Sequence, residues 1–107
     1  MVTPATMITT KDTLENGSLA WSGPVTYRTV TRLYRELQKS IEAFSGTAIT
    51  IDLAAVTEID SAGIALLVNS GLEARARNIA LAFSNLNTQA QSLIKLYGVT
   101  DMVAVTR

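Results

Sequence analysis

Cysteine and histidine are both absent from this chain of 107 residues. Without cysteine there is no disulfide and no thiolate nucleophile, and without histidine there is no imidazole base. Ordinary zinc sites also draw on these two residue types. Most enzyme chemistry is excluded with them, so we expect a protein without catalytic residues, metal or cofactor.

Net charge and long apolar runs are lacking as well. Nine basic and nine acidic side chains cancel, which disfavours direct binding to nucleic acid or to an anionic membrane surface. The longest apolar run, Ala62 to Val68, is far below the roughly 20 residues that span a bilayer. The opening "MVTPATMITTKD" has no basic residue before Lys11 and no long apolar core, unlike a secretory signal. We therefore expect a soluble, cytoplasmic protein.

The chain has the size of one domain and shows no internal repeat or long linker, so a single domain over residues 1–107 is expected. Near its start, Met7 to Thr13 and Ser18 to Ser22 are separated by "ENG", which favours a β-hairpin. Apolar residues at spacings of three and four then predict a long helix that Ser45-Gly46 ends. These apolar residues are Val30, Leu33, Leu37, Ile41 and Phe44.

Strands and helices alternate through the rest of the chain. "TAITIDLAAV" and "IALAFS" alternate apolar with polar or small residues and predict strands. Residues 61–77 predict a helix whose apolar side holds Ile64, Leu67, Val68, Gly71 and Leu72. "NTQAQSLIKLYG" predicts a third helix, capped by Asn87 and ended by Gly98. This order favours an α/β fold in which helices cover a small sheet.

The stretch "EIDSAGIALLV", residues 58–68, admits several interpretations. Asp60 is a natural N-cap for the helix that follows, and Ser61 then lies near the surface. A catalytic serine would need a base, and without histidine only lysine or carboxylate arrangements remain, which nothing in the spacing supports. A phosphate loop would need more glycines than Gly63 and a lysine. Glu58 and Asp60 could form an acid–base or metal pair, although a solvated rim is the simpler interpretation.

The predicted helix also suggests a docking face. Projection at 100° per residue places Ala62, Gly63 and Leu66 away from the apolar side, so we expect Leu66 on the solvent-facing side. Scattered surface leucines are common. The alternative is a partner surface, where small residues permit close approach and Leu66 is an apolar anchor. Tyr34 on the first helix is expected to pack at a buried edge and is a further candidate for a partner contact.

The segment "ITIDLAAVTEIDSAGIALL", with the helix, strand and "LIKLYGV" that follow, resembles the STAS domain family of sulfate transporters and anti-sigma factor antagonists. "LAWSGPV", "DSAGIALL" and "LIKLYGVTDMV" are most similar to the MlaB group, the cytoplasmic STAS subunits of bacterial phospholipid ABC transporters. The resemblance implies a mixed sheet of four to five strands covered by about three or four helices.

The resemblance also implies a partner. In MlaB-like proteins the edge that corresponds to Asp60, Ser61, Ala62 and Gly63 packs against the ATPase subunit and through it reaches the permease, with a hydroxyl residue directly after the aspartate. A non-enzymatic subunit at the inner membrane, serving outer-membrane lipid asymmetry, would follow.

Two alternatives remain open at the sequence level. Anti-sigma factor antagonists carry a phosphorylatable serine directly before the glycine, where this chain has Ala62. Phosphorylation of Ser61 is a minor hypothesis, because the phosphate would suit a helix N-terminus but lie beside Asp60. Nucleotide binding, which has been proposed for some STAS domains, is the second alternative.

Overall fold

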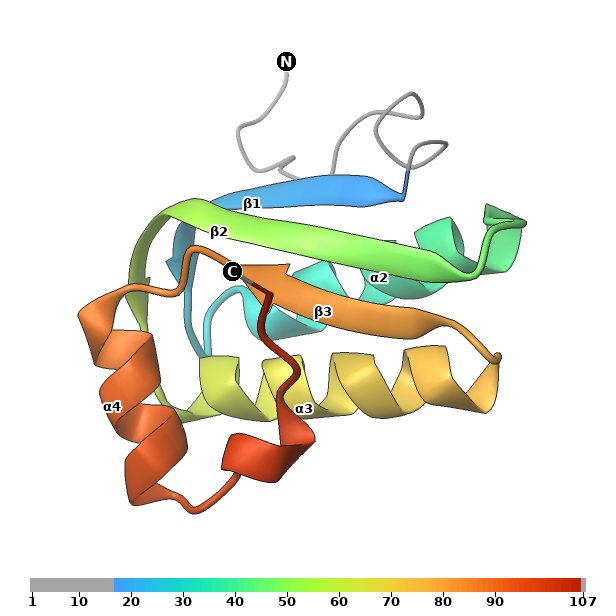
Figure 1. Ribbon diagram of the computed structural model, residues 1–107. Helices are drawn as coiled ribbons and strands as arrows, with labels where there is room; N and C mark the ends of the chain where they lie inside the picture. Colours follow the sequence, from blue (N-terminus) through green and yellow to red (C-terminus); the bar gives the residue numbers. More distant parts are fainter. Residues whose placement is uncertain (1–16, 107) are drawn as a thin grey trace.

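The computed structural model describes residues 17–106. In this part of the chain strands and helices alternate up to a C-terminal 3₁₀ turn, η1 (Figure 1). The elements are β1 (Ser18–Val25), α2 (Val30–Ala43), β2 (Ala48–Ile59), α3 (Ser61–Ala76), β3 (Ala80–Ser84), α4 (Thr88–Leu96) and η1 (Thr100–Met102). The predicted helices and strands within this range are confirmed, including an α/β fold with three α-helices.

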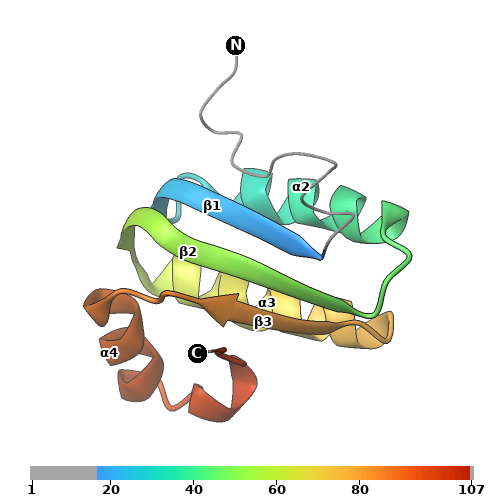
Figure 2. The same cartoon turned by 45° about the horizontal axis from the view of Figure 1, so that its top comes forward.

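The sheet of the described residues has three strands in the order β1-β2-β3, and both pairs are parallel. Parallel neighbours need crossover connections, and these are right-handed in nearly all proteins. The helices α2 and α3 therefore lie along the same face of the sheet, as both views show (Figures 1 and 2). Between residues 17 and 106 no helix is both long and apolar enough to span a bilayer.

The expected count of four to five strands is not confirmed. Residues 17–106 contribute three strands, and Val105 adds a single parallel bridge to Phe83 at the β3 edge. The predicted hairpin cannot be compared fully, because Met7 to Thr13 lie outside the described residues; its second segment is the strand β1.

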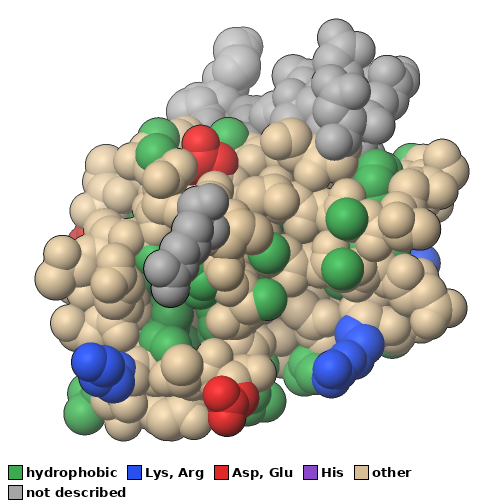
Figure 3. Space-filling view, viewed as in Figure 1, with side chains coloured by type: hydrophobic (Ala, Val, Ile, Leu, Met, Phe, Trp, Pro, Cys, Tyr) green, Lys and Arg blue, Asp and Glu red, His purple; other side chains and the backbone are tan. Residues whose placement is uncertain are grey.

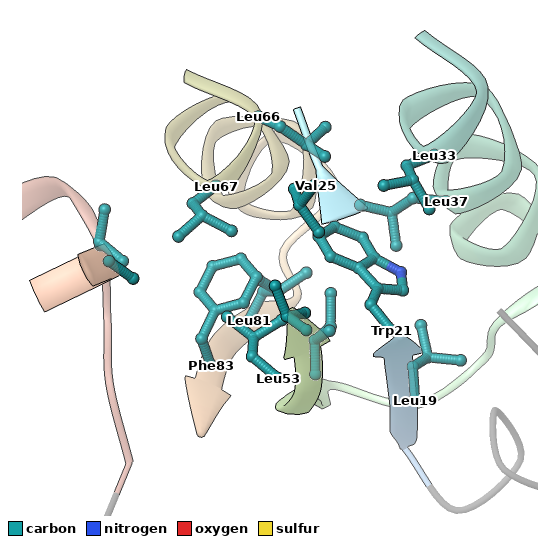
Figure 4. Close-up of a cluster of buried hydrophobic side chains, with 14 of the residues drawn as sticks. Leu19, Trp21, Val25, Leu33, Leu37, Leu53, Leu66, Leu67, Leu81 and Phe83 are labelled. Atoms are coloured by element: carbon teal, nitrogen blue, oxygen red, sulfur yellow. The ribbon is translucent and has the colours of Figure 1, made fainter. Parts of the chain in front are cut away.

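The core lies between the sheet and the two helices (Figure 4). Trp21 from β1 is completely buried, and its ring centroid lies 6.3 Å from that of Phe83 on β3. Leu33 and Leu37 from α2 and Leu67 from α3 close over them. Each such side chain contributes about 1.5–3 kcal/mol through burial of apolar surface. The core thus fixes the two helices on the sheet.

The opposite face of the sheet carries small side chains, such as Ala20, Thr50 and Ala82. Figure 3 shows few charged side chains on this side. Asp52 lies on this face, because it alternates along β2 with the buried Ile51 and Leu53. Its Oδ1 accepts hydrogen bonds from Asn85 Nδ2 at 2.9 Å and the Ala54 amide at 2.9 Å. The bond from Asn85 lowers the pKa of Asp52, and the Ala54 amide adds to that shift.

Candidate protein-interaction site

The strands β1 and β2 end side by side, and the helices α2 and α3 begin directly after them. The carboxyl ends of parallel strands are the usual position of binding sites in open α/β sheets. Val25 pairs with Ile59 as the last residue of each strand. The stretch that stood out in the sequence, Asp60 to Gly63, therefore starts α3 at this edge.

Asp60 holds two chain segments with one carboxylate. Its Oδ1 accepts a hydrogen bond from the Gly63 amide at 2.9 Å, which caps α3. Its Oδ2 accepts from the Tyr27 amide at 3.0 Å, which ties the β1–α2 connection to the start of α3. The N-cap prediction is confirmed, and the second bond shows that Asp60 also fixes the neighbouring loop. Both oxygens are engaged in holding the backbone.

Gly63 permits the close approach of α3 to the sheet. An added Cβ would collide with the Val25 carbonyl oxygen and would lie 2.6 Å from Ile59 Cγ1. The residue is buried, so no side chain larger than hydrogen fits without moving the helix start or the end of β1. Gly63 therefore contributes to the site through packing and not as a contact surface.

Ser61 and Ala62 form the accessible part of this helix start. Ser61 is exposed and Ala62 is half-buried, while Gly63 lies beneath them. Because Asp60 and Gly63 fix the backbone on either side, the Ser61 hydroxyl is presented from a rigid position. The prediction that Ser61 lies at the surface is confirmed.

Leu66 is buried, at 4 % exposure, so the expectation of a solvent-facing leucine is wrong. Its side chain points from α3 toward Leu33 and Leu37 of α2 (Figure 4). Gly63, also expected on the outer side, is buried on the same side of the helix together with Ser70, whereas Leu72, expected on the buried side, is 49 % exposed. The buried face lies roughly a quarter turn from the predicted one, because α3 packs against α2 as well as against the sheet.

A groove of about 420 Å³ runs between α2 and α3 beside the helix start. Leu66 is part of its lining, with Ala62, Ala65 and Asn69 from α3 and Tyr34 and Arg35 among the residues from α2. Leu66 can thus touch a partner only through this groove. The lining combines methyl groups with a few hydrogen-bonding side chains, as protein interfaces do.

Tyr34 is half-buried and spans the two helices. Its hydroxyl donates to Glu73 Oε1 at 3.2 Å, and Arg77 Nε donates to Glu73 Oε2 at 3.1 Å. Arg77 also pairs with Glu42 of α2 at 3.8 Å. Burial raises the pKa of Tyr34, and the hydrogen bond to Glu73 adds to that shift. The expected edge packing is confirmed, and the residue also lines the groove.

Tyr27 is a surface residue that the sequence did not single out as a site. It is 66 % exposed, and its amide is the group bound by Asp60. Arg28 Nε donates to its hydroxyl at 3.1 Å, and the guanidinium lies 5.3 Å from the ring centroid. Its position next to Asp60 depends on a hydrogen bond between residues 33 apart in the sequence, which no local pattern indicates.

The chemical capacity of this edge is binding by hydrogen bonds and apolar contact. Ser61 offers a hydroxyl, Ala62 and Ala65 offer methyl groups, and Tyr27 offers an aromatic ring. Within residues 17–106 no group of three or more Asp and Glu side chains lies close enough together to hold a metal ion. The Asp60 carboxylate instead binds backbone amides.

Comparison with known proteins identifies the family. The family model described as "Mlab, STAS domain" matches residues 8–104, whereas no curated protein matches the chain. Among solved structures, the anti-sigma factor antagonist SpoIIAA in its unphosphorylated form has a TM-score of 0.67 at 14 % identity, over 84 % of this chain and 78 % of that chain. A putative anti-sigma factor antagonist from Thermotoga maritima reaches 0.71 at 14 % identity, over 82 % and 75 %.

The SulP transporter STAS domain from Vibrio cholerae has a TM-score of 0.66 at 17 % identity, over 82 % of this chain and 70 % of that chain. At such identities these structures show a shared fold. The family model, by contrast, covers nearly the whole sequence. The chain therefore belongs to the STAS domain family, in the group whose family model carries the description MlaB.

Proposed function

We propose that this protein is a non-enzymatic subunit that docks on the ATPase of a phospholipid-transporting ABC complex. The docking surface comprises the exposed start of α3 and the groove beside it. Ser61 and Ala62 make the first contacts, and Tyr34 and Leu66 contribute through the groove. Family membership supports this proposal, because the matching model is described as MlaB.

The single observation that carries the proposal is the rigid presentation of Ser61. The Asp60 carboxylate accepts hydrogen bonds from two backbone amides, that of Gly63 in α3 at 2.9 Å and that of Tyr27 in the β1–α2 connection at 3.0 Å. A surface held in place before binding loses little conformational entropy when a partner docks. An exposed hydroxyl between small residues then allows close backbone approach and a rim hydrogen bond.

Such a subunit acts on its partner through binding alone. A protein that binds one arrangement of the ATPase more tightly than another shifts the ATPase toward that arrangement. It also stabilises the folded partner by mass action. The domain would therefore change ATP hydrolysis and transport without a reaction of its own, and would lie at the inner membrane through the partner complex.

The test is a pull-down of the tagged, full-length protein from its native cell extract, with partners identified by mass spectrometry. Ser61→Glu is compared with Ser92→Glu, since Ser92 is an exposed serine on α4. An ABC ATPase and its permease should be recovered with the wild type and the Ser92 variant and lost with the Ser61 variant. Recovery of no ABC component, or equal recovery with both variants, would refute the proposal.

A second candidate, an anti-sigma factor antagonist, is favoured by the fold shared with SpoIIAA. Ala62 argues against it, because it stands where such proteins carry the phosphorylated serine. The exposed hydroxyl that a kinase could phosphorylate at the start of α3 is that of Ser61. Its phosphate would lie beside the Asp60 carboxylate. Incubation with an anti-sigma kinase and ATP, followed by intact-mass measurement, separates the two functions: a mass gain of one phosphate in the wild type that Ser61→Ala abolishes would favour this candidate.

A further inference from the structure

Four basic residues follow one side of α2 and the turn before it. Arg28, Arg32, Arg35 and Lys39 are separated by four, three and four residues, and all four are exposed. This spacing places residues on one helix face. The resulting basic stripe extends over about three helical turns, roughly 16 Å.

Intramolecular ion pairs do not neutralise this stripe within the described part of the chain. Both ion pairs found there belong to Arg77, with Glu42 and Glu73. Glu36 lies four residues after Arg32 and three before Lys39, at the edge of the same face, where it is half-buried and has no ion pair, so it offsets only part of the charge of the four basic residues. The whole chain carries equal numbers of acidic and basic side chains, so the stripe is a local concentration of positive charge.

The basic stripe runs beside the groove between α2 and α3. Arg35 belongs to both, because it lines the groove together with Leu66. The groove wall on α3 is uncharged where it is formed by Ala62, Ala65 and Asn69. A groove that combines apolar side chains, such as Leu66 and Ala65, with polar ones, such as Thr31 and Gln38, therefore lies beside a cationic edge on one side only.

We propose that this surface binds an acidic amphipathic helix of the partner protein. The apolar side chains of that helix would enter the groove over Leu66, and its Asp or Glu side chains, at spacings of three and four, would face the basic stripe. This is the helix-in-groove mode of recognition, with rim charges setting orientation and association rate. The inference rests on the proposed function, because it names the partner segment that the same site receives.

A recessed groove favours a protein segment over a membrane surface. Helices that lie on membranes project apolar side chains outward beside their basic residues. Here the apolar residues of α2, including Leu33, Leu37 and Ile41, are buried in the core. The surface beside the stripe is hollow and fits inserted side chains.

The test uses the full-length protein in complex with the ABC ATPase. A photo-crosslinking amino acid replaces Asn69, at the groove, in one variant and Ser61, at the helix start, in another. Crosslinked partner peptides are sequenced by mass spectrometry. We expect the Asn69 variant to capture an ATPase segment with net negative charge and helical apolar spacing.

The crosslinkers at positions 61 and 69 distinguish failure of the acidic-helix proposal from failure of the proposed function. Capture of the ATPase from position 61 but not from 69, or capture of a neutral or basic segment at 69, would overturn the acidic-helix proposal alone. Failure of both positions to capture the ATPase would overturn both proposals.

Charge reversal provides the second readout. Arg32 and Lys39 do not line the groove, so R32E/K39E alters charge without changing groove shape. We expect about tenfold weaker binding to the ATPase at low salt, mostly through a slower association rate, and a difference that disappears near roughly 0.5 M salt. The matched control R75E/K95E reverses two exposed cations outside the stripe and should bind as the wild type does.

A vesicle-binding assay tests the alternative that the basic stripe binds a membrane surface. The isolated protein is sedimented with vesicles containing about one third phosphatidylglycerol. No sedimentation supports the acidic-helix proposal. Sedimentation that R32E/K39E abolishes, combined with unchanged ATPase affinity in that variant, would overturn it in favour of lipid headgroups.

Discussion

Replacing Gly63 with alanine places a methyl group where the start of α3 meets the sheet. The new Cβ would lie 2.6 Å from Ile59 Cγ1 and would collide with the Val25 carbonyl oxygen. The carbonyl belongs to backbone and cannot rotate away, so overpacking should cost about 1–3 kcal/mol. Alanine is also the better helix former, by up to about 1 kcal/mol. We expect the collision to prevail, with a net loss of about 1–2 kcal/mol.

Gly71 in the same helix provides the matched control. A Cβ added there meets only the Met102 carbonyl oxygen, at the ordinary contact distance of 3.8 Å. Gly71→Ala should therefore stabilise the protein by about 0.5–1 kcal/mol through helix propensity.

Thermal unfolding followed by fluorescence of Trp21, the only tryptophan and fully buried, measures both variants. The melting temperature should fall by roughly 5–10 °C for Gly63→Ala and rise by a few degrees for Gly71→Ala. A stabilised Gly63→Ala, or shifts of the same sign in both variants, would refute the packing argument at the helix start.

Three further predictions concern other parts of the molecule. In urea unfolding, Leu66→Ala should lower the free energy of unfolding by about 2–5 kcal/mol, because Leu66 is buried. Leu72→Ala should lower it by less than about 1 kcal/mol, because Leu72 is half-exposed. Equal decreases in the two variants would contradict the burial of Leu66. Asp60→Ala should lower stability by about 1–2 kcal/mol, with Asp60→Asn intermediate because it keeps one acceptor oxygen; an unaffected Asp60→Ala would contradict the two amide bonds. The lowered pKa of Asp52 contributes stability that is present above the unfolded value near about 3.9 and is lost as pH falls through the folded pKa. Asn85→Gly keeps the positive φ of 59° accessible but removes the amide donor, so its acid unfolding midpoint should move to higher pH; an unchanged midpoint would count against that bond.

Local sequence patterns were sufficient to predict the helices, the strands and their caps. Asp60 and Asn87 each accept a hydrogen bond from the amide three residues later, at 2.9 and 2.8 Å. The buried residues Leu33, Leu37 and Ile41 follow the helical spacing of α2. These features depend on neighbours within one or two turns, which the sequence displays directly.

The buried face of α3 could not be predicted in the same way. Apolar residues occur around much of this helix, so local periodicity does not decide which side is covered. The deciding contact is with α2, whose position follows from two crossovers on the same side of the sheet. The burial of Leu66 and the position of the groove beside it therefore depend on the topology of the fold. The placement of Tyr27 next to Asp60 depends on it as well.

The proposed role of the rigid start of α3 is to bind an ABC ATPase. Its most direct test is the dissociation constant of the purified ATPase subunit for the wild type, Ser61→Glu and Ser92→Glu, measured together with the urea midpoint of each protein. We expect at least about tenfold weaker binding for Ser61→Glu alone, or 1.4 kcal/mol, with all three midpoints equal. Equal dissociation constants, or a Ser61→Glu protein that loses stability along with binding, would contradict it.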